Sequence, residues 1–218
     1  MRLSVGAVAL LLASPVLADS LLPSREIAAS AIEGYIRPAF HQFAEEAGSL
    51  RFTAGKLCEA PSEDALAVTR SQFGSTVISF SRVEFVRVGP LGKADRMERL
   101  LFWPDRKGIA LRQVQAALAE KDETAAAPET LQEKSVAMQG LVALEYLLFG
   151  AGADTLAAGD DYRCRYAKAS AALIAELAET LDREWGDPNG QGAHMLSPQP
   201  EFDDFRTDTE VLEKLAAT

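Results

Sequence analysis

The chain has 218 residues, a formal net charge of −10 and a sequence pI near 4.8, and hydrophobic residues make up 48% of it. This length and apolar fraction are sufficient for one domain, or for one domain and part of a second, with a sizeable core. The acidic balance argues against a nucleic-acid-binding protein, which needs a basic face. It is compatible with a soluble protein that meets cations.

Residues 1–18 have the pattern of a secretory signal peptide. Arg2 provides the charged start, residues 5–12 form an apolar core, and residues 16–18 have the small-residue character of a cleavage site. The alternative is a retained N-terminal anchor, but the apolar run is too short to span a membrane stably. We therefore expect a mature chain that begins near Asp19, has no transmembrane segment and, in a Gram-negative bacterium, lies in the periplasm.

The chain contains two cysteines, Cys58 and Cys164. In an oxidising compartment they can form a disulfide, which would close a loop of about a hundred residues and contribute about 4–5 kcal/mol in the chain-entropy model. The alternative is two unpaired thiols. Two cysteines and two histidines cannot make a Cys/His zinc site of the usual spacing.

Apolar residues at three- and four-residue steps predict two helices in the first part of the chain. The first is expected over residues 24–50, with a kink or break at Pro38, which lacks the N–H that a helix interior needs. The second is expected over residues 62–88, with its first residue, a serine, as the cap. Residues 76–88 are rich in β-branched and aromatic side chains, so a strand is the alternative there. Residues 55–61 are expected to connect the two helices.

The sequence WPDRKG at residues 103–108 predicts a turn-rich loop before a further helix at residues 109–119. In the structural interpretation, Trp103 plugs the core and Asp105 caps the helix that follows. In the functional interpretation, Asp105 or Arg106 lies near a carboxylate of the central helix, which comes next in the chain.

The stretch QGLVALEYLLFG, residues 139–150, is expected to be the C-terminal half of a long apolar helix that begins near Pro128. Glu145 falls on its apolar face, so it must be paired, protonated or bound to a cation if it is buried. It could be a metal ligand or a general acid/base. It could instead bond a neighbouring Arg or Tyr, or reach water at the edge of the stripe. Gly140 indicates a closely crossing helix, and Gly150 suits a left-handed residue after the last turn.

A long helix is expected over residues 162–185, and a new helix over residues 207–217 begins just before the chain stops, as if the natural sequence continued. The elements predict an all-α, up-and-down helical bundle at residues 19–190. We expect residues 191–218 to be a loop and the start of a second, truncated bundle. Gly-rich phosphate loops, GxSxG and HExxH motifs are absent from the sequence.

The motifs at residues 103–108 and 140–150, together with the signal and the run DDYRCRY at residues 160–166, resemble the imelysin family. The resemblance covers about the first bundle and the start of the second. It implies an exported bacterial protein with two helical bundles related by duplication and a functional site between them. Members of the family are described as insulin-cleaving metallopeptidases, as iron-regulated proteins and as periplasmic iron-uptake components.

The family motif is G-x-H-x-x-E. Gly140 and Glu145 match its ends, but Val142 stands at the His position and cannot coordinate a metal. The resemblance therefore implies Glu145 as a possible ligand without its His partner, and Asp105 is a candidate second ligand. Iron or another divalent cation is the candidate cofactor, because carboxylate oxygens suit such ions.

Three functions remain open. The favoured one is an exported, non-catalytic protein linked to iron uptake, which binds a metal or a partner among iron-uptake components in the periplasm or at the outer membrane. The second is a metal-dependent peptidase of the imelysin type, which needs a water-activating metal and at least three ligands. The third is a metal-free helical interaction module, which Val142 favours.

Overall fold

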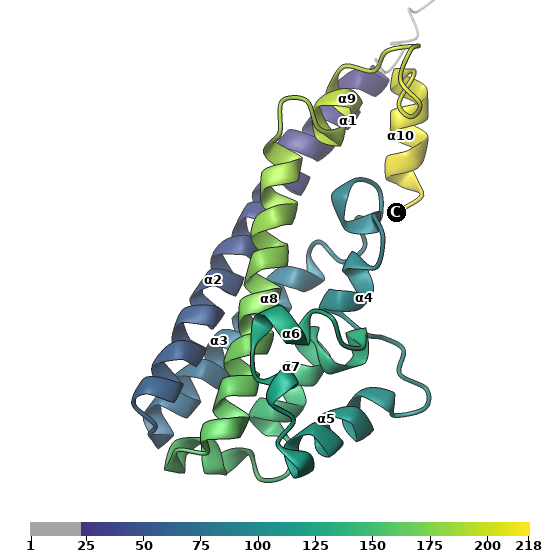
Figure 1. The fold of residues 1–218 in the computed structure, drawn as a ribbon. Helices are drawn as coiled ribbons and strands as arrows, with labels where there is room; N and C mark the ends of the chain where they lie inside the picture. The colour runs from purple at the N-terminus through teal and green to yellow at the C-terminus, as the bar shows by residue number, and fades with distance from the viewer. Residues whose placement is uncertain (1–22) are drawn as a thin grey trace, which may run out of the picture.

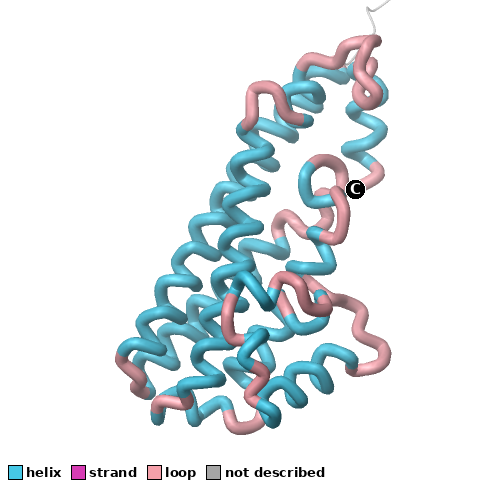
Figure 2. The backbone as a smooth tube through the Cα atoms, in the orientation of Figure 1, coloured by secondary structure: helices cyan, strands magenta, loops and turns pink. Residues whose placement is uncertain are grey.

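We describe residues 23–218 in a computed structural model of the chain. This part consists of helices and loops and contains no strand, which confirms the all-α class (Figures 1 and 2). None of its helices is long and apolar enough to cross a membrane. The expected signal peptide, residues 1–18, lies outside the described residues.

Two long helices, α2 (Arg37–Glu59) and α8 (Asp161–Gly186), pack along each other and form the spine of the molecule (Figure 1). The helix α3 (Glu63–Ser81) packs against α2. Small side chains on the facing stripes allow the two spine helices to approach closely, and larger side chains fill the layers between them. The buried residues include Phe40, Phe43, Ala47, Leu50, Ala54 and Leu57 of α2, and Ala167, Ala171, Ile174, Ala178 and Leu181 of α8.

The first expected helix is interrupted, as predicted, but one turn earlier than Pro38. A helix α1 (Ser24–Ala31) passes into one π-helical turn, η1 (Ile32–Ile36), and Pro38 occupies the first turn of α2. A proline is tolerated there because the first N–H groups of a helix have no partner within it. The helix also runs beyond its expected end to Glu59. Cys58 therefore lies in its last turn rather than in a connecting segment, and that expectation was wrong.

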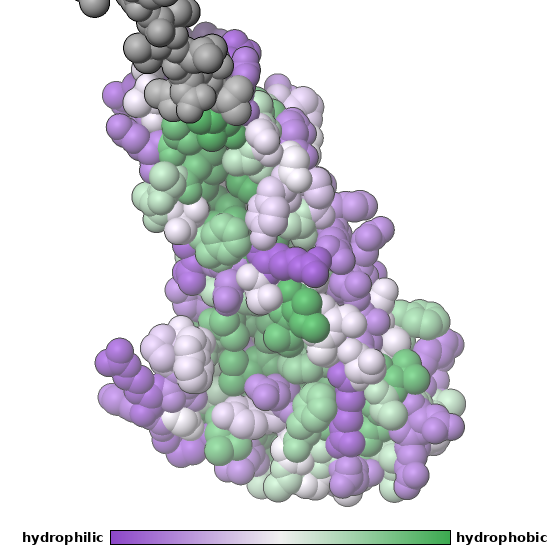
Figure 3. Space-filling view, turned by 180° about the vertical axis from the view of Figure 1, so that it is seen from behind, coloured by the Kyte–Doolittle hydropathy of each residue, from purple (hydrophilic) through white to green (hydrophobic). Residues whose placement is uncertain are grey.

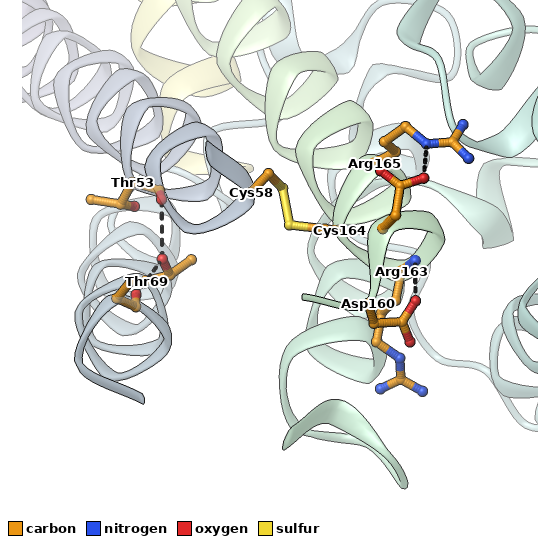
Figure 4. Close-up of a disulfide and its surroundings, with 9 residues drawn as sticks. Thr53, Cys58, Thr69, Asp160, Arg163, Cys164 and Arg165 are labelled. Carbon is orange, nitrogen blue, oxygen red and sulfur yellow. Dashed lines mark hydrogen bonds and ion pairs between the residues drawn. A yellow bond between two sulfur atoms is a disulfide. The ribbon is translucent and has the colours of Figure 1, made fainter. Parts of the chain in front are cut away.

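The predicted disulfide between Cys58 and Cys164 is present, with the two Cα atoms 5.5 Å apart across a sequence separation of 106 residues. It joins the end of α2 to the first turn of α8 (Figure 4). The alternative of two unpaired thiols is thus wrong. The cross-link holds the start of α8 in place, next to the segment that follows α7 (Gly140–Phe149).

The helix α3 begins as expected, because the Ser62 hydroxyl accepts a hydrogen bond from the N–H of Ala65 at 3.1 Å. It ends at Ser81, so the prediction that it continues to residue 88 was wrong. Residues 82–88 form turns and irregular chain, and the alternative of a strand is also not observed there. The β-branched residues of this run disfavour the helix, and the carbonyl of Arg82 accepts a hydrogen bond from a tyrosine hydroxyl instead.

Short helices complete the bundle around this spine. Those near the C-terminus, α9 (Gln191–Leu196) and α10 (Asp208–Ala216), pack near α1 at one end of the molecule (Figure 1). The short elements are η2 (Pro90–Gly92), α4 (Arg96–Leu100), α5 (Ile109–Glu120), η3 (Glu123–Ala125), α6 (Pro128–Leu131), η4 (Val136–Met138), α7 (Gly140–Phe149), η5 (Ala153–Ala158), α9 (Gln191–Leu196) and α10 (Asp208–Ala216).

The division of the chain into a bundle at residues 19–190 and the start of a second bundle at residues 191–218 stays a prediction.

Candidate functional site

The helix α7 carries the motif residues, and it is a separate ten-residue helix rather than half of a long one. The expected helix from residue 128 already ends at Leu131, and turns and a short 3-10 helix follow it. Directly before α7, Gln139 is extended (φ −124°, ψ 178°) and Gly140 has a φ of +69°, which glycine adopts without strain. The buried amide of Gln139 donates a hydrogen bond to the carbonyl of Lys134 at 2.9 Å. The side chain thereby stabilises the loop that replaces the middle of the expected helix.

The close backbone approach predicted at Gly140 is confirmed, although it lies at the start of α7. A Cβ atom on Gly140 would lie 2.2 Å from the carbonyl oxygen of Arg99 and 2.6 Å from that of Leu100, at the end of α4. Only glycine fits both this contact and the positive φ. Gly150, by contrast, has a φ of −69°, so the expected left-handed residue after the last turn is not observed.

Two arginines hold the other end of α7. The Nε of Arg70, on α3, donates to the carbonyl of Leu148 at 2.8 Å. Arg163, on α8, is buried and donates to the carbonyls of Leu147 at 3.4 Å and Ala151 at 2.8 Å. Burial lowers the pKa of Arg163 from its ordinary value. Cations suit this end of the helix, where carbonyl groups have no partner within it, so α7 is fixed at both ends.

A groove lies between α3 and α7, and it is the candidate functional site. Its cavity volume is about 250 Å³, and Val142 and Glu145 of the family motif both line it. The deepest side chains are apolar, since Phe73, Phe80 and Leu141 are buried. The complete lining consists of Phe73, Val77, Phe80, Ser81, Glu84, Leu101, Leu141, Val142 and Glu145.

Glu145 is exposed at the edge of this groove, so the expectation of a carboxylate facing the core was wrong. Within residues 23–218 its side chain makes no hydrogen bond or ion pair. The alternative, in which the residue reaches water at the edge of the stripe, is the one observed. The helix buries Leu144, Leu147 and Leu148 instead, and it leaves Phe149 half exposed.

The two helices that form the groove also carry exposed apolar side chains. Val77, Ile78 and Phe149 have exposed fractions of 37%, 60% and 50%. Phe149 packs against Phe73, with ring centroids 5.7 Å apart, and its ring lies 5.4 Å from the guanidinium of Arg70. The view from behind shows hydrophobic surface exposed between hydrophilic side chains (Figure 3). Exposed apolar surface that is bordered by polar groups is typical of binding sites.

The WPDRKG loop does not contribute to this groove. Trp103 is 74% exposed, so the expectation that it plugs the core was wrong. Asp105 caps α5 as predicted, because its carboxylate accepts the N–H groups of Ile109 at 2.8 Å and Ala110 at 2.9 Å. These bonds hold the pKa of Asp105 below its ordinary value. Neither Asp105 nor Arg106 lines the groove that contains Glu145. Their functional roles stay predictions.

Three residues that matter at the site were not singled out from the sequence. Arg70 and Arg163 hold α7, and Glu84 adds a second carboxylate to the groove. Arg163 belongs to the run DDYRCRY, which therefore contained a usable signal. Glu84 follows Val77 at helical spacing, but it lies beyond the end of α3, where a periodic pattern loses its meaning.

Comparison with known proteins identifies the class. The model of the imelysin family matches residues 36–218, and the chain belongs to this family. A crystal structure of an imelysin-like protein from Psychrobacter arcticum 273-4 superposes with a TM-score of 0.71 at 20% sequence identity, and thus shares the fold. The match covers 88% of this chain and 58% of that one, so the chain spans less than two thirds of its length. Curated protein sequences give no match.

The described residues do not fit the metal of a metallopeptidase. Val142 has no ligand atom at the motif position where the family pattern has His, and both carboxylate oxygens of Asp105 accept backbone N–H groups. Over residues 23–218, His, Cys, Asp and Glu form no group of three or more that could hold a metal ion. A water-activating metal needs about three protein ligands and an open position, and this part of the chain does not offer such a set.

We expect Gly140→Ala to lower the free energy of unfolding by at least about 3 kcal/mol, because it combines backbone strain with overlap against α4. Urea unfolding followed by circular dichroism measures the change. Gly48→Ala is the matched control, since a Cβ there meets nothing within 4 Å, and we expect it to raise stability by about 0.5–1 kcal/mol. Equal effects of the two substitutions would show that Gly140 does not position α7.

Proposed function

We propose that this imelysin-family protein is an exported, non-catalytic binding protein linked to iron uptake, and that it binds through the groove between α3 and α7. The proposal rests on the residues that line the groove. The two motif residues Val142 and Glu145 line an open, largely apolar hollow, with valine at the motif's His position. Apolar surface with a few polar groups at its edge suits recognition rather than hydrolysis.

The link to iron uptake rests on family resemblance, and it can be tested in the source organism. We expect a strain without the gene to grow poorly when iron is limiting, and the wild-type gene to restore growth. Val142→Arg should fail to restore it, because the substitution places a bulky cation in the groove. Val68→Arg is the matched control. Val68 belongs to α3, the other helix that borders the groove, but it is 56% exposed and does not line the groove.

Growth that is restored equally by both arginine variants would contradict a role for the groove. If the deletion has no effect under iron limitation, the link to iron uptake fails, whatever the groove binds. Immunoblots of fractionated cells must show equal amounts of each variant and report whether the protein is exported.

Metal binding is the second candidate, and the groove itself motivates it. Ser81, Glu84 and Glu145 line one hollow, and hard cations prefer oxygen ligands such as their side chains carry. Two carboxylates without further protein ligands make a weak site. Partner binding therefore remains the first candidate.

We expect calorimetric titration with ferrous, ferric, zinc and calcium ions to show dissociation constants weaker than about 100 µM for the wild type. Val142→His places an imidazole one turn from Glu145, and we expect it to raise the zinc affinity at least about tenfold. Glu145→Ala in the Val142→His background should abolish that gain. Micromolar or tighter binding by the wild type that is lost in Glu145→Ala would transfer the proposed role from partner to metal binding.

A further inference from the structure

The shape of the groove suits the binding of one more helix. On the α3 side, Phe73, Val77 and Phe80 follow one another at steps of four and three residues, and Glu84 lies in the turn that follows the helix. On the α7 side, Leu141 and Glu145 are four residues apart. The rows of side chains on these two elements border an apolar groove between them. The ridge of side chains on a third helix can pack into such a groove. A helix lying in such a groove uses apolar anchors at positions i, i+3 or i+4, and i+7.

The charges at the groove are acidic and uncompensated in the described part of the chain. Neither the carboxylate of Glu84 nor that of Glu145 forms an ion pair or a hydrogen bond within residues 23–218. Elsewhere in the described part of the chain some carboxylates have partners, as Glu184 pairs with Arg96 at 2.7 Å, whereas others, such as Glu98 and Glu129, are exposed and unpaired. The open apolar groove is thus flanked by two carboxylates that a ligand can approach. Such a site favours an incoming positive charge.

We propose that the groove between α3 and α7 binds an amphipathic helix of a partner protein, whose apolar stripe lies in the groove and whose Lys or Arg side chains pair with Glu84 and Glu145. This inference rests on the proposed binding function and specifies the chemistry of the partner. A second copy of the chain is a poor occupant, because the formal net charge of −10 opposes self-association and would bring acidic edges together. Charge complementarity favours a basic partner.

A designed peptide of about 18 residues, roughly five helical turns, is the probe. It carries a leucine stripe flanked by lysines and a fluorescent label, and fluorescence anisotropy measures its binding to the full mature protein. Two comparison peptides have the lysines replaced by glutamates, or the same composition in an order that destroys the stripe. The protein variants are Val142→Arg and the double variant Glu84→Gln/Glu145→Gln.

The matched control is Glu98→Gln/Glu129→Gln, which removes the same charge from two exposed glutamates outside the groove. We expect Val142→Arg to weaken binding of the basic peptide at least about tenfold, because the arginine removes apolar contact in the groove and repels the lysines of the peptide. The groove double variant should weaken it about threefold to tenfold and reduce its salt dependence. The control variant should bind within about twofold of the wild type. Both groove variants are expected to keep the wild-type thermal unfolding midpoint within a few degrees.

Several results would overturn the proposal. One is an equal loss of peptide affinity in the control double variant and the groove double variant. Another is that the glutamate peptide, or the peptide with the rearranged sequence, binds as tightly as the basic peptide. A third is that both groove variants bind the basic peptide with wild-type affinity. Dimerisation of the wild type that Val142→Arg abolishes, seen by light scattering, would assign the groove to a second copy instead. The basic peptide could fail to bind the wild-type protein while Val142→Arg still fails to restore growth under iron limitation. That combination would leave the proposed binding function in place and refute only the basic helix as the partner.

Discussion

The position of α7 is the constraint on which the rest of the site depends. At its start, Gly140 lies against the backbone carbonyls of Arg99 and Leu100, closer than any other residue could. At its end, Arg70 and Arg163 reach from two different helices to the last carbonyl groups. Apart from Glu145 and Tyr146, the ten residues of α7 are apolar or glycine on every side, so the helix has only a weak preferred face of its own. The groups at its two ends therefore decide which side is buried and which side borders the groove.

The spine of the molecule supplies the frame for these end contacts. Cys164 is bonded to Cys58 at the first turn of α8, and Arg163 precedes it directly in the chain (Figure 4). Asp160 caps the same turn, since its carboxylate accepts the N–H of Arg163 at 3.1 Å. The disulfide, the cap and the buried guanidinium thus stand within five residues of one another. The cross-link between α2 and α8 fixes the residue that holds the end of α7.

The sequence predicted those features that depend on local chemistry. The caps at Ser62 and Asp105, the disulfide and the helical class are correct, because each follows from short-range hydrogen bonding, redox chemistry or periodicity. The family resemblance rests on the signal and on the short runs at residues 103–108, 140–150 and 160–166, and the family is confirmed over residues 36–218.

The features that depend on tertiary context could not be predicted in the same way. Every residue near Glu145 is apolar, so the periodicity could not distinguish the face that contains Leu144 from the face that contains Val142. The exposure of Trp103 contradicts its hydrophobicity, and no local signal marks it. Just after the end of α3, the carbonyl of Arg82 accepts a hydrogen bond from the hydroxyl of Tyr35, more than forty positions away in the chain, and no local pattern marks this contact. Roles in binding, metal ligation or iron uptake depend on partners and remain proposals.

Cysteine labelling at position 142 measures whether the groove that Val142 lines is open to an incoming partner. Val142→Cys in the mature protein adds one thiol to a chain whose two cysteines are paired. We expect a maleimide to label it within about tenfold of the rate for Val68→Cys, an exposed position on α3, because accessible thiolates react freely. Labelling as slow as that of Leu144→Cys, a fully buried position, would contradict the account and show that the groove is closed in solution.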